Sequence, residues 1–171
     1  MSQQEMLGGT RFTFREAAAG DIETILHQRR RMFTDMGYPA DANLDGALSA
    51  SRDFFSAWMA DGRCRAWLVE TPGGEVVAGG GVLMTPHLPS PRDPNPVRPL
   101  IVNVYTDPAF RRRGIARRLM DIMLAWCRSQ GFGSVALYAS VDGKPLYEAA
   151  GFVPTNEMRL MLRNASTRPG P

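Results

Sequence analysis

Residues 107–120 read DPAFRRRGIARRLM, and this stretch begins a helix in an unusual way. The apolar positions that follow predict a helix that starts near Gly114. Its first turn lacks the Ser, Thr, Asp or Asn that commonly caps the free amides of a helix. Five arginines stand there instead, although a helix N-terminus already carries about half a positive charge. They are Arg111, Arg112, Arg113, Arg117 and Arg118.

A bound phosphate would remove this conflict. Each exposed cation at a helix N-terminus costs about 0.3–1 kcal/mol, and amides without a cap forgo about 1 kcal/mol more. An anion reverses both effects, because unpaired amides and the positive end of the helix dipole form an anion site. Gly114 lets the backbone approach a ligand closely, and Ala116 keeps the next turn narrow. We therefore interpret the stretch as a phosphate-binding turn; the alternative is a solvated basic face.

The glycine pattern excludes two common phosphate sites. The chain contains neither the G-x-x-x-x-G-K-[ST] of nucleoside triphosphatases nor a G-x-G-x-x-G between a strand and a helix. Gly79, Gly80 and Gly81 lie inside a predicted strand and precede no helix. They indicate a bulge or close backbone packing instead.

The composition of the chain, 44% hydrophobic and 22% charged over 171 residues, predicts one soluble domain over 1–171. No apolar run approaches the roughly 20 residues of a membrane span, and the N-terminus lacks the apolar stretch of a signal peptide. Cys64 and Cys127 match no metal or redox spacing, so we expect reduced thiols, no metal site and a cytoplasmic protein. The net charge of +3 does not favour nucleic-acid binding by the chain as a whole.

Hydrophobic periodicity predicts ten elements in the order β-α-α-β-β-β-α-β-α-β. In the first helix, Asp21 is the expected cap and Arg29 lies on the apolar side. Six prolines make 86–99 a loop, which either serves a site or is disordered. The tail, 164–171, is expected to be disordered. The strands are expected over 11–17, 64–71, 75–84, 100–106, 134–140 and 152–162, and the helices over 20–38, 44–59, 114–131 and 144–151.

Two blocks of sequence resemble the GNAT superfamily, the acyl-CoA-dependent N-acyltransferases. RRRGIA, 111–116, fits the family signature [Q/R]-x-x-G-x-[G/A], and LYASVDGKPLYEAAGF, 137–152, resembles the second conserved block, which ends in L-Y-E-x-x-G-F. The element order also fits, so the resemblance spans about residues 11–162. It implies an α/β (α+β) fold with a mixed, mostly antiparallel central sheet, a splayed V-shaped opening and flanking helices.

The resemblance implies acetyl-CoA as co-substrate. Its pyrophosphate would lie on the amides from Arg112 to Arg117, and its pantetheine arm would pair with the backbone of Val104 and Thr106. Many family members have Asn at the position of Ser140, which still offers a hydroxyl. The residues expected to bind the cofactor are Val104, Tyr105, Thr106, Arg111, Arg112, Arg113, Gly114, Ile115, Ala116, Arg117 and Ser140.

Tyr147 is the expected catalytic residue, because the family commonly places a tyrosine of this motif beside the cofactor sulfur. A phenol with a pKa of about 10 can protonate a thiolate whose conjugate acid has a pKa near 8.5 at modest cost. The alternative is that Tyr147 only packs the short helix, with its hydroxyl hydrogen-bonded. A backbone N–H near Val104 or Tyr105, the residue expected at the thioester end, would polarise the thioester carbonyl.

The general base stays open. Some family members carry a glutamate on the strand before the phosphate turn, where this chain has Asn103, which cannot accept a proton. Glu70, His87, Asp35 and Asp142 are candidates, directly or through water. A water chain to bulk solvent is equally compatible.

The predicted reaction is acetyl transfer to a primary amine of a small molecule or peptide. The acceptor is expected between the first two helices and the proline-rich loop, where Asp35, Asp41 and Asp45 are candidates to attract a cationic amine or are ordinary loop acids. One alternative is a non-catalytic acyl-CoA sensor, and another is a nucleic-acid binder that uses the Arg111–Arg118 cluster. The leading prediction includes neither a nucleic-acid partner nor a membrane partner. A homodimer is expected only by analogy with the family.

Overall fold

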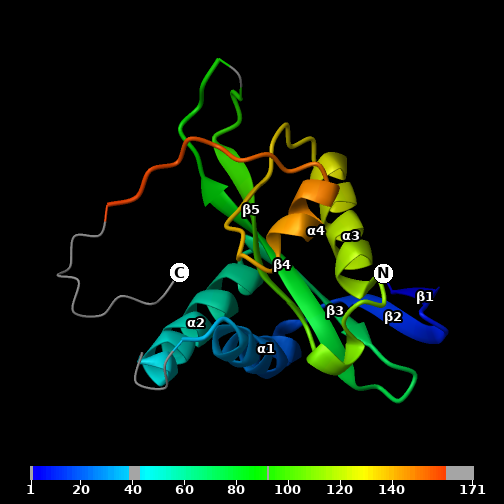
Figure 1. Cartoon of the computed structure of the whole chain (residues 1–171). Helices are drawn as coiled ribbons and strands as arrows, with labels where there is room; N and C mark the ends of the chain where they lie inside the picture. The colour runs from blue at the N-terminus through cyan, green and yellow to red at the C-terminus, as the bar shows by residue number, and fades with distance from the viewer. Residues whose placement is uncertain (1, 39–42, 92, 161–171) are drawn as a thin grey trace.

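Six strands form one sheet and follow one another in chain order across it (Figure 1). They are β1 (Gln3–Leu7), β2 (Thr10–Glu16), β3 (Cys64–Glu70), β4 (Val76–Pro86), β5 (Val97–Thr106) and β6 (Ala136–Leu137). The first five pair antiparallel, and β6 joins β5 in parallel. The computed structural model describes residues 2–38, 43–91 and 93–160, so the tail expected to be disordered, 164–171, lies outside the described residues.

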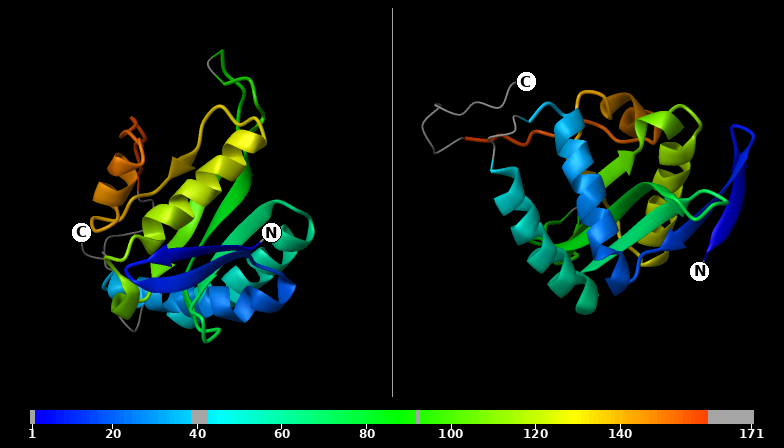
Figure 2. Two further views of the ribbon diagram at one scale, coloured as in Figure 1. Left: turned by 90° about the vertical axis from the view of Figure 1, so that its right-hand side faces the viewer. Right: turned by 90° about the horizontal axis from the view of Figure 1, so that it is seen from below.

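Helices cover both faces of the sheet (Figure 2). They are α1 (Ile22–Asp35), α2 (Leu44–Ala60), α3 (Ile115–Ser129) and α4 (Lys144–Ala149), with short 3-10 turns at Ala19–Asp21 and Pro108–Phe110. α1 and α2 pack against one face through Leu26 and Phe55. α3 packs against the other face through Leu119 and Met123, and Tyr147 of α4 adds to that core. None of the helices in the described part of the chain is long and apolar enough to cross a membrane.

Strand β3 shows how one segment serves both cores. Cys64, Ala66 and Leu68 pack in the core beneath α1 and α2, whereas Trp67 and Val69 pack in the core beneath α3. Successive side chains of a strand point to opposite faces, so a strand with helices on both sides must be apolar at nearly every position. The sheet with helices on both faces confirms the predicted fold class.

The three glycines of β4 confirm the expectation of a bulge or close backbone packing. The register between β4 and β5 shifts between Gly79 and Gly81. A Cβ atom on Gly80 would lie 3.2 Å from Cε of Met123 in α3, and one on Gly79 would lie 3.2 Å from the carbonyl oxygen of Trp67. The absence of side chains here brings α3 close to the centre of the sheet.

The N-terminal strand β1 is an element that the sequence analysis missed. It forms a hairpin with β2 through Gly8 and Gly9, whose φ angles of +56° and +79° suit a tight turn. Most of its side chains are exposed, and only Leu7 packs against the core. With so little burial, its sequence has no clear hydrophobic alternation.

The strand predicted over 152–162 is wrong for its described part, because residues 152–160 form neither strand nor helix. Pro154 cannot donate to a strand ladder, and the apolar Val153 and Met158 are 77% and 95% exposed. An alternating sequence forms a strand only where a neighbouring strand accepts it. For the same reason the strand expected over 134–140 is reduced to the two residues of β6.

Two smaller predictions also need correction. Asp21 stands at the start of α1 but does not cap it: its carboxylate accepts from the amide of Ala18 and pairs with Arg15, both at 2.8 Å. The loop predicted over 86–99 is shorter, because β4 runs to Pro86 and β5 starts at Val97. The prolines between them lie in a hairpin that projects from the end of the sheet (Figure 1).

Substitution Leu119→Ala tests the packing of α3. Leu119 is fully buried, so we expect the free energy of unfolding to fall by about 2–5 kcal/mol. The matched control is Leu88→Ala, because Leu88 is 86% exposed, and its effect should stay within about 0.5 kcal/mol. Urea unfolding followed by circular dichroism measures both; equal effects would contradict the packing described above.

Candidate active site

One extra residue in β5 distorts the centre of the sheet. Between the pairings at Val102 and Tyr105, two residues of β5, Asn103 and Val104, stand opposite the single Gly80 of β4. Asn103 takes the left-handed backbone conformation with φ +57°, which asparagine tolerates better than most residues. Such a bulge bends its strand and increases the local twist.

Beyond the bulge, β5 has an open edge. β6 pairs only with Leu100 and Ile101, and no strand in the described ranges pairs with 102–106 on that side. The two strands therefore part after Ile101, which leaves an opening along this edge of β5.

The backbone of Val104 and Thr106 faces this opening. The amide of Asp107 donates to the carbonyl of Val77 in β4, 2.8 Å away. Because backbone groups alternate along a strand, the amides of Thr106 and Val104 point away from β4. Arg111 Nε already donates to the Thr106 carbonyl, at 3.0 Å.

The start of α3 lacks a cap, as the sequence predicted. Gly114 precedes the helix with φ +84°, and no side chain caps the first turn. Among the described residues, none of the six amides from Arg112 to Arg117 has a hydrogen-bond acceptor; the first paired amide is that of Arg118, which donates to the Gly114 carbonyl at 3.0 Å. A series of six unpaired amides beside a helix N-terminus is the geometry that binds phosphate groups.

Three of the five arginines at this turn are paired within the protein. Arg111 forms an ion pair with Asp35 at the end of α1. Arg118 pairs with Glu5 of β1. Arg117 lies 3.3 Å from the carboxylate of Asp121 and donates to a carbonyl of α4 at 2.8 Å. These pairs secure the turn to α1, β1 and α4, and they argue against a basic face for nucleic acid.

The other two arginines have no carboxylate partner in the described part of the chain. Arg112 is exposed and makes no hydrogen bond there. Arg113 lies over the ring of Phe110, 5.1 Å from its centroid, and donates to the carbonyl of Ala109. Two cations without a counter-charge therefore stand beside the six amides.

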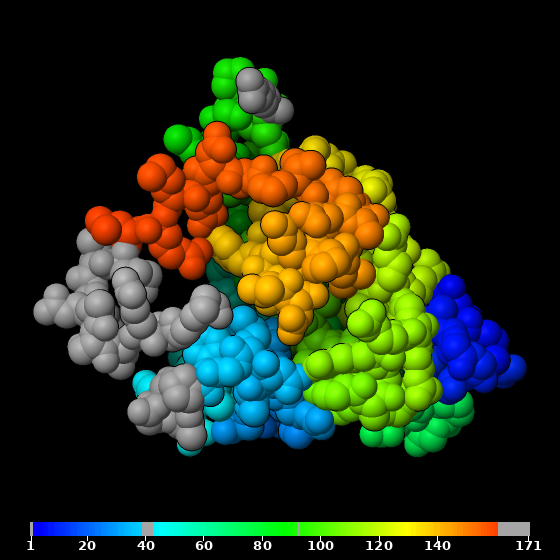
Figure 3. Space-filling view, in the orientation of Figure 1, coloured from blue at the N-terminus to red at the C-terminus, as the bar shows by residue number. Residues whose placement is uncertain are grey.

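Tyr147 lies on α4, next to the start of α3. In Figure 3 the start of α3 lies between α4 and α1. Two contacts join these elements: Arg117 donates to the carbonyl of Ala149 in α4, and Arg111 pairs with Asp35 in α1. The Tyr147 ring packs edge-on against Phe152, with centroids 6.2 Å apart. Its hydroxyl makes no hydrogen bond to any described residue, and burial raises its pKa. Tyr147 therefore packs as the alternative interpretation expected, but its hydroxyl is not hydrogen-bonded to a described residue as that interpretation required.

Ser140 shapes the turn that leads into α4. Its hydroxyl oxygen accepts from the amide of Gly143 at 3.1 Å, and its carbonyl accepts from the amide of Lys144 at 3.0 Å. A Cβ atom on Gly143 would lie 2.8 Å from the ring of Tyr147. Ser140 therefore holds the turn against Tyr147, and its hydroxyl proton stays available to another acceptor.

Most of the acidic residues considered from the sequence hold arginines. Glu70 pairs with Arg15 at 2.5 Å, and Asp35 pairs with Arg111. Asp45 pairs with Arg30 at 2.5 Å. The remaining candidates are Asp142, which is exposed, His87, which lies in the projecting hairpin, and Asp41, which lies outside the described residues.

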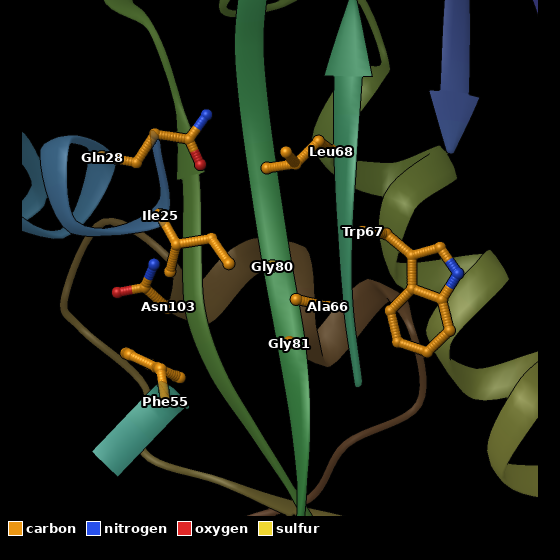
Figure 4. Close-up of a pocket in the computed structure, with 9 residues that line it drawn as sticks. All are labelled: Ile25, Gln28, Phe55, Ala66, Trp67, Leu68, Gly80, Gly81 and Asn103. Atoms are coloured by element: carbon orange, nitrogen blue, oxygen red, sulfur yellow. The ribbon is translucent and has the colours of Figure 1, made fainter. Parts of the chain in front are cut away.

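On the α1 side of the bulge, the structure places polar residues that the sequence analysis did not assign to the site. Arg29 of α1 donates from Nη1 to Oδ1 of Asn103 at 3.3 Å and from Nε to Oγ of Ser51 at 3.0 Å. Gln28 is 3% exposed, and neither atom of its amide group has a partner among the described residues. Gln28 and Asn103 line one small cavity (Figure 4). The sequence feature that could have indicated these residues is Arg29, an arginine on the apolar side of the first helix.

The two cysteines are buried and unpaired. Burial raises the pKa of Cys64 to about 12 and that of Cys127 to about 11. Neither thiol is a nucleophile near neutral pH, because the thiolate is the reactive form. Across the described ranges, no group of three or more His, Cys, Asp or Glu side chains is arranged to hold a metal ion.

Comparison with known proteins assigns this architecture to a family. The model of the acetyltransferase (GNAT) family matches residues 26–152. The chain belongs to the GNAT family of acetyltransferases. The match covers both the bulged strand β5 and the uncapped start of α3.

Solved GNAT structures share the fold. A GCN5-related N-acetyltransferase from Ralstonia eutropha JMP134 is 32% identical, with a TM-score of 0.83, over 88% of this chain and 98% of that chain. A predicted acetyltransferase from Clostridium acetobutylicum, solved with acetyl-CoA, is 24% identical, with a TM-score of 0.80, over 88% and 95%. An aminoglycoside N-acetyltransferase in complex with CoA is 17% identical, with a TM-score of 0.64, over 95% and 96%. No curated protein matches the chain.

The burial of the two thiols predicts how slowly they react in this GNAT protein. Because the pKa of each thiol is raised well above neutrality, we expect Ellman's reagent at pH 8 to modify neither cysteine in the folded protein within minutes. Both thiols of the chain should react once guanidinium unfolds it. Rapid stoichiometric modification of the folded protein would show that one thiol is accessible and ionised.

Proposed function

We propose that this GNAT protein transfers the acetyl group of acetyl-CoA directly to a primary amine of a small molecule or peptide. The observation that carries the proposal is the series of amides from Arg112 to Arg117, which have no acceptor in the described chain. They lie at one end of the open edge of β5. An extended ligand with a diphosphate at one end fits this arrangement.

The diphosphate would lie on the first turn of α3. The amides of Gly114, Ile115 and Ala116 stand at the positive end of the helix dipole, and they are joined by those of Arg112, Arg113 and Arg117. The guanidinium groups of Arg112 and Arg113 supply positive charge that no carboxylate of the described residues neutralises. Arg111 would act indirectly, because its ion pair with Asp35 fixes the start of the turn.

The pantetheine arm would lie along the open edge of β5. Its amide groups can pair with backbone groups of Val104 and Thr106 as a further strand would. The Thr106 carbonyl is already occupied by Arg111, so Thr106 would contribute its N–H. This places the acyl end beside the bulge, next to Val104 and Tyr105.

Acetyl-CoA supplies an activated acyl group, and the protein must polarise its carbonyl and protonate the departing sulfur. By strand alternation the Val104 N–H faces the opening, where it would stabilise the developing oxyanion. The Tyr105 N–H points towards β4 by strand alternation, which leaves Val104 as the donor. Tyr147 is the proposed general acid; because burial raises its pKa, the phenol stays protonated throughout the neutral range.

The acceptor amine must also lose a proton. Asn103 cannot accept one, and Glu70 and Asp35 already hold Arg15 and Arg111. We favour transfer through water to bulk solvent, which requires no dedicated carboxylate. The reaction then needs neither a covalent acyl-enzyme nor a cysteine.

The substitution Gly114→Ala tests the phosphate turn. At φ +84° an alanine is strained by about 1–2 kcal/mol, and it displaces amides that hold the diphosphate. We expect the dissociation constant for acetyl-CoA, measured by calorimetry, to rise about tenfold or more.

The matched control for this change is Gly131→Ala, at the other end of α3. Gly131 has φ +77°, and a Cβ atom there meets nothing within 4 Å. This variant should lose similar stability and keep its affinity for acetyl-CoA. Equal affinities of both variants, or no affinity of the parent protein, would refute the proposed site.

Substitution Tyr147→Phe tests the general acid. The loss of a positioned proton donor should lower kcat about 10²-fold or more. In the parent protein, kcat should fall only on the alkaline side of the ordinary phenol pKa of about 10, because the raised pKa keeps Tyr147 protonated below that value. The variant should lack this alkaline fall.

The control variant is Tyr138→Phe, since Tyr138 is 62% exposed and packs against Arg159. It should keep both kcat and the pH profile. An unchanged kcat in Tyr147→Phe at every pH would remove Tyr147 from the mechanism.

A further inference from the structure

We propose that the acceptor amine carries a carboxylate, and that Arg29 binds this carboxylate. The inference rests on the proposed function and adds the class of acceptor to it: an amino acid or another amino carboxylate. It concerns the α1 side of the bulge, opposite the edge assigned to acetyl-CoA.

Arg29 is a partly buried cation with neutral surroundings. Its donors contact the hydroxyl of Ser51 and the amide oxygen of Asn103, and its guanidinium lies over the ring of Phe33, 4.6 Å from the centroid. None of the carboxylates that the structure describes forms an ion pair with it. Burial lowers its pKa, as expected for a desolvated cation without a counter-charge.

The other arginines show that this is exceptional. Most of those in the described ranges pair with a carboxylate, and four of the other six are exposed. Only Arg29 and Arg113 are both at least half-buried and without a carboxylate partner. Arg113 lies at the proposed diphosphate site, where an anion supplies the missing charge. The exposed arginines without such a partner are Arg11, Arg98, Arg112 and Arg128.

Arg29 lies close to the place proposed for the acetyl group. It contacts Asn103, the bulge residue that immediately precedes Val104, the proposed oxyanion donor. A further buried group beside the bulge, the amide of Gln28, lacks a partner within the described chain. Figure 4 shows Gln28 and Asn103 on the α1 side of β5. Such polar groups are stable in a buried site when a polar ligand satisfies them.

The guanidinium retains the donors that a carboxylate needs. Of its five N–H donors, two are used by Ser51 and Asn103, so three remain. Of the acids that the sequence suggested for a cationic acceptor, Asp35 and Asp45 hold Arg111 and Arg30, and Asp41 lies outside the described residues. The charge available to an acceptor in the described site is therefore positive.

The test compares amino acids with their α-carboxamides, which keep the amine and the side chain and lack the negative charge. CoA release is followed with acetyl-CoA at saturation, and saturation-transfer NMR with CoA-loaded protein reports acceptor binding independently. We expect one or more amino carboxylates to exceed their carboxamides by about tenfold or more in kcat/KM or in binding. Affinity for acetyl-CoA, measured by calorimetry, reports on the proposed function separately.

Three variants assign the preference to Arg29. Arg29→Gln should abolish it without changing the affinity for acetyl-CoA, and Arg29→Lys should restore part of it. Asn103→Asp would give Arg29 an internal carboxylate in nearly the same volume, and should also abolish the preference. The matched control is Arg30→Gln, because Arg30 is the neighbouring exposed arginine and pairs with Asp45 at the surface; it should keep the preference.

Each outcome decides the proposal. A carboxylate preference that is lost in Arg29→Gln and Asn103→Asp, but kept in Arg30→Gln, supports it. Equal use of acids and carboxamides, a preference that survives Arg29→Gln, or no detectable binding of any amino carboxylate to protein that binds CoA, overturns it. Circular dichroism confirms that each variant is folded, and Asn103→Asp tests the idea even if Arg29→Gln does not fold.

Discussion

The bulge at Asn103 is the constraint on which the site depends. If β5 kept its register with β4, its backbone would continue straight and could remain paired with the strand on its other side. One inserted residue in the left-handed conformation turns the strand instead, and β6 pairs with it at only two positions. The stretch from Val104 to Thr106 thereby keeps hydrogen-bonding groups that no neighbouring strand in the described chain uses.

The glycines of β4 make this distortion compatible with a packed protein. Gly80 stands opposite the two bulged residues, and α3 approaches it so closely that a Cβ atom would meet Met123 at 3.2 Å. α3 is thus held firmly against the sheet, with its N-terminus beside the end of β5. The packing of α3 against the sheet fills the core and also positions the uncapped turn. The same residues therefore determine both the stability of the fold and the geometry of the site.

The sequence predicted those features that depend on local chemistry. An uncapped helix start surrounded by arginines can be recognised without any tertiary information, because the dipole and the unpaired amides belong to the helix itself. The glycine run of β4 likewise predicted close packing. The predicted strand at 152–160 failed because a strand needs a partner, which local alternation cannot reveal, and β1 was missed because its exposed residues have little hydrophobic pattern.

The site residues show the same division. The amides of the turn could be placed from the sequence, whereas the pairing of Arg111 and Arg118 could not, because their carboxylate partners lie in α1 and β1. The pair of Arg117 with Asp121 is local, four residues along one helix, but the bond from Arg117 to α4 is not. Arg29 could be placed on the apolar side of its helix. Its contact with Asn103, 74 residues away in sequence, depends on the packing of α1 against β5.

The proposed direct transfer requires both substrates to meet at one point, and the sheet has two sides at the bulge. On one side lies the open edge of β5 that ends at the uncapped turn, and on the other, beneath α1, lie Arg29, Gln28 and Asn103. Each has a partly buried arginine without a carboxylate partner among the described residues, Arg113 for the first and Arg29 for the second. Since an unpaired cation destabilises a folded protein unless a ligand compensates it, the position of Arg29 is more readily explained by the second substrate than by the fold.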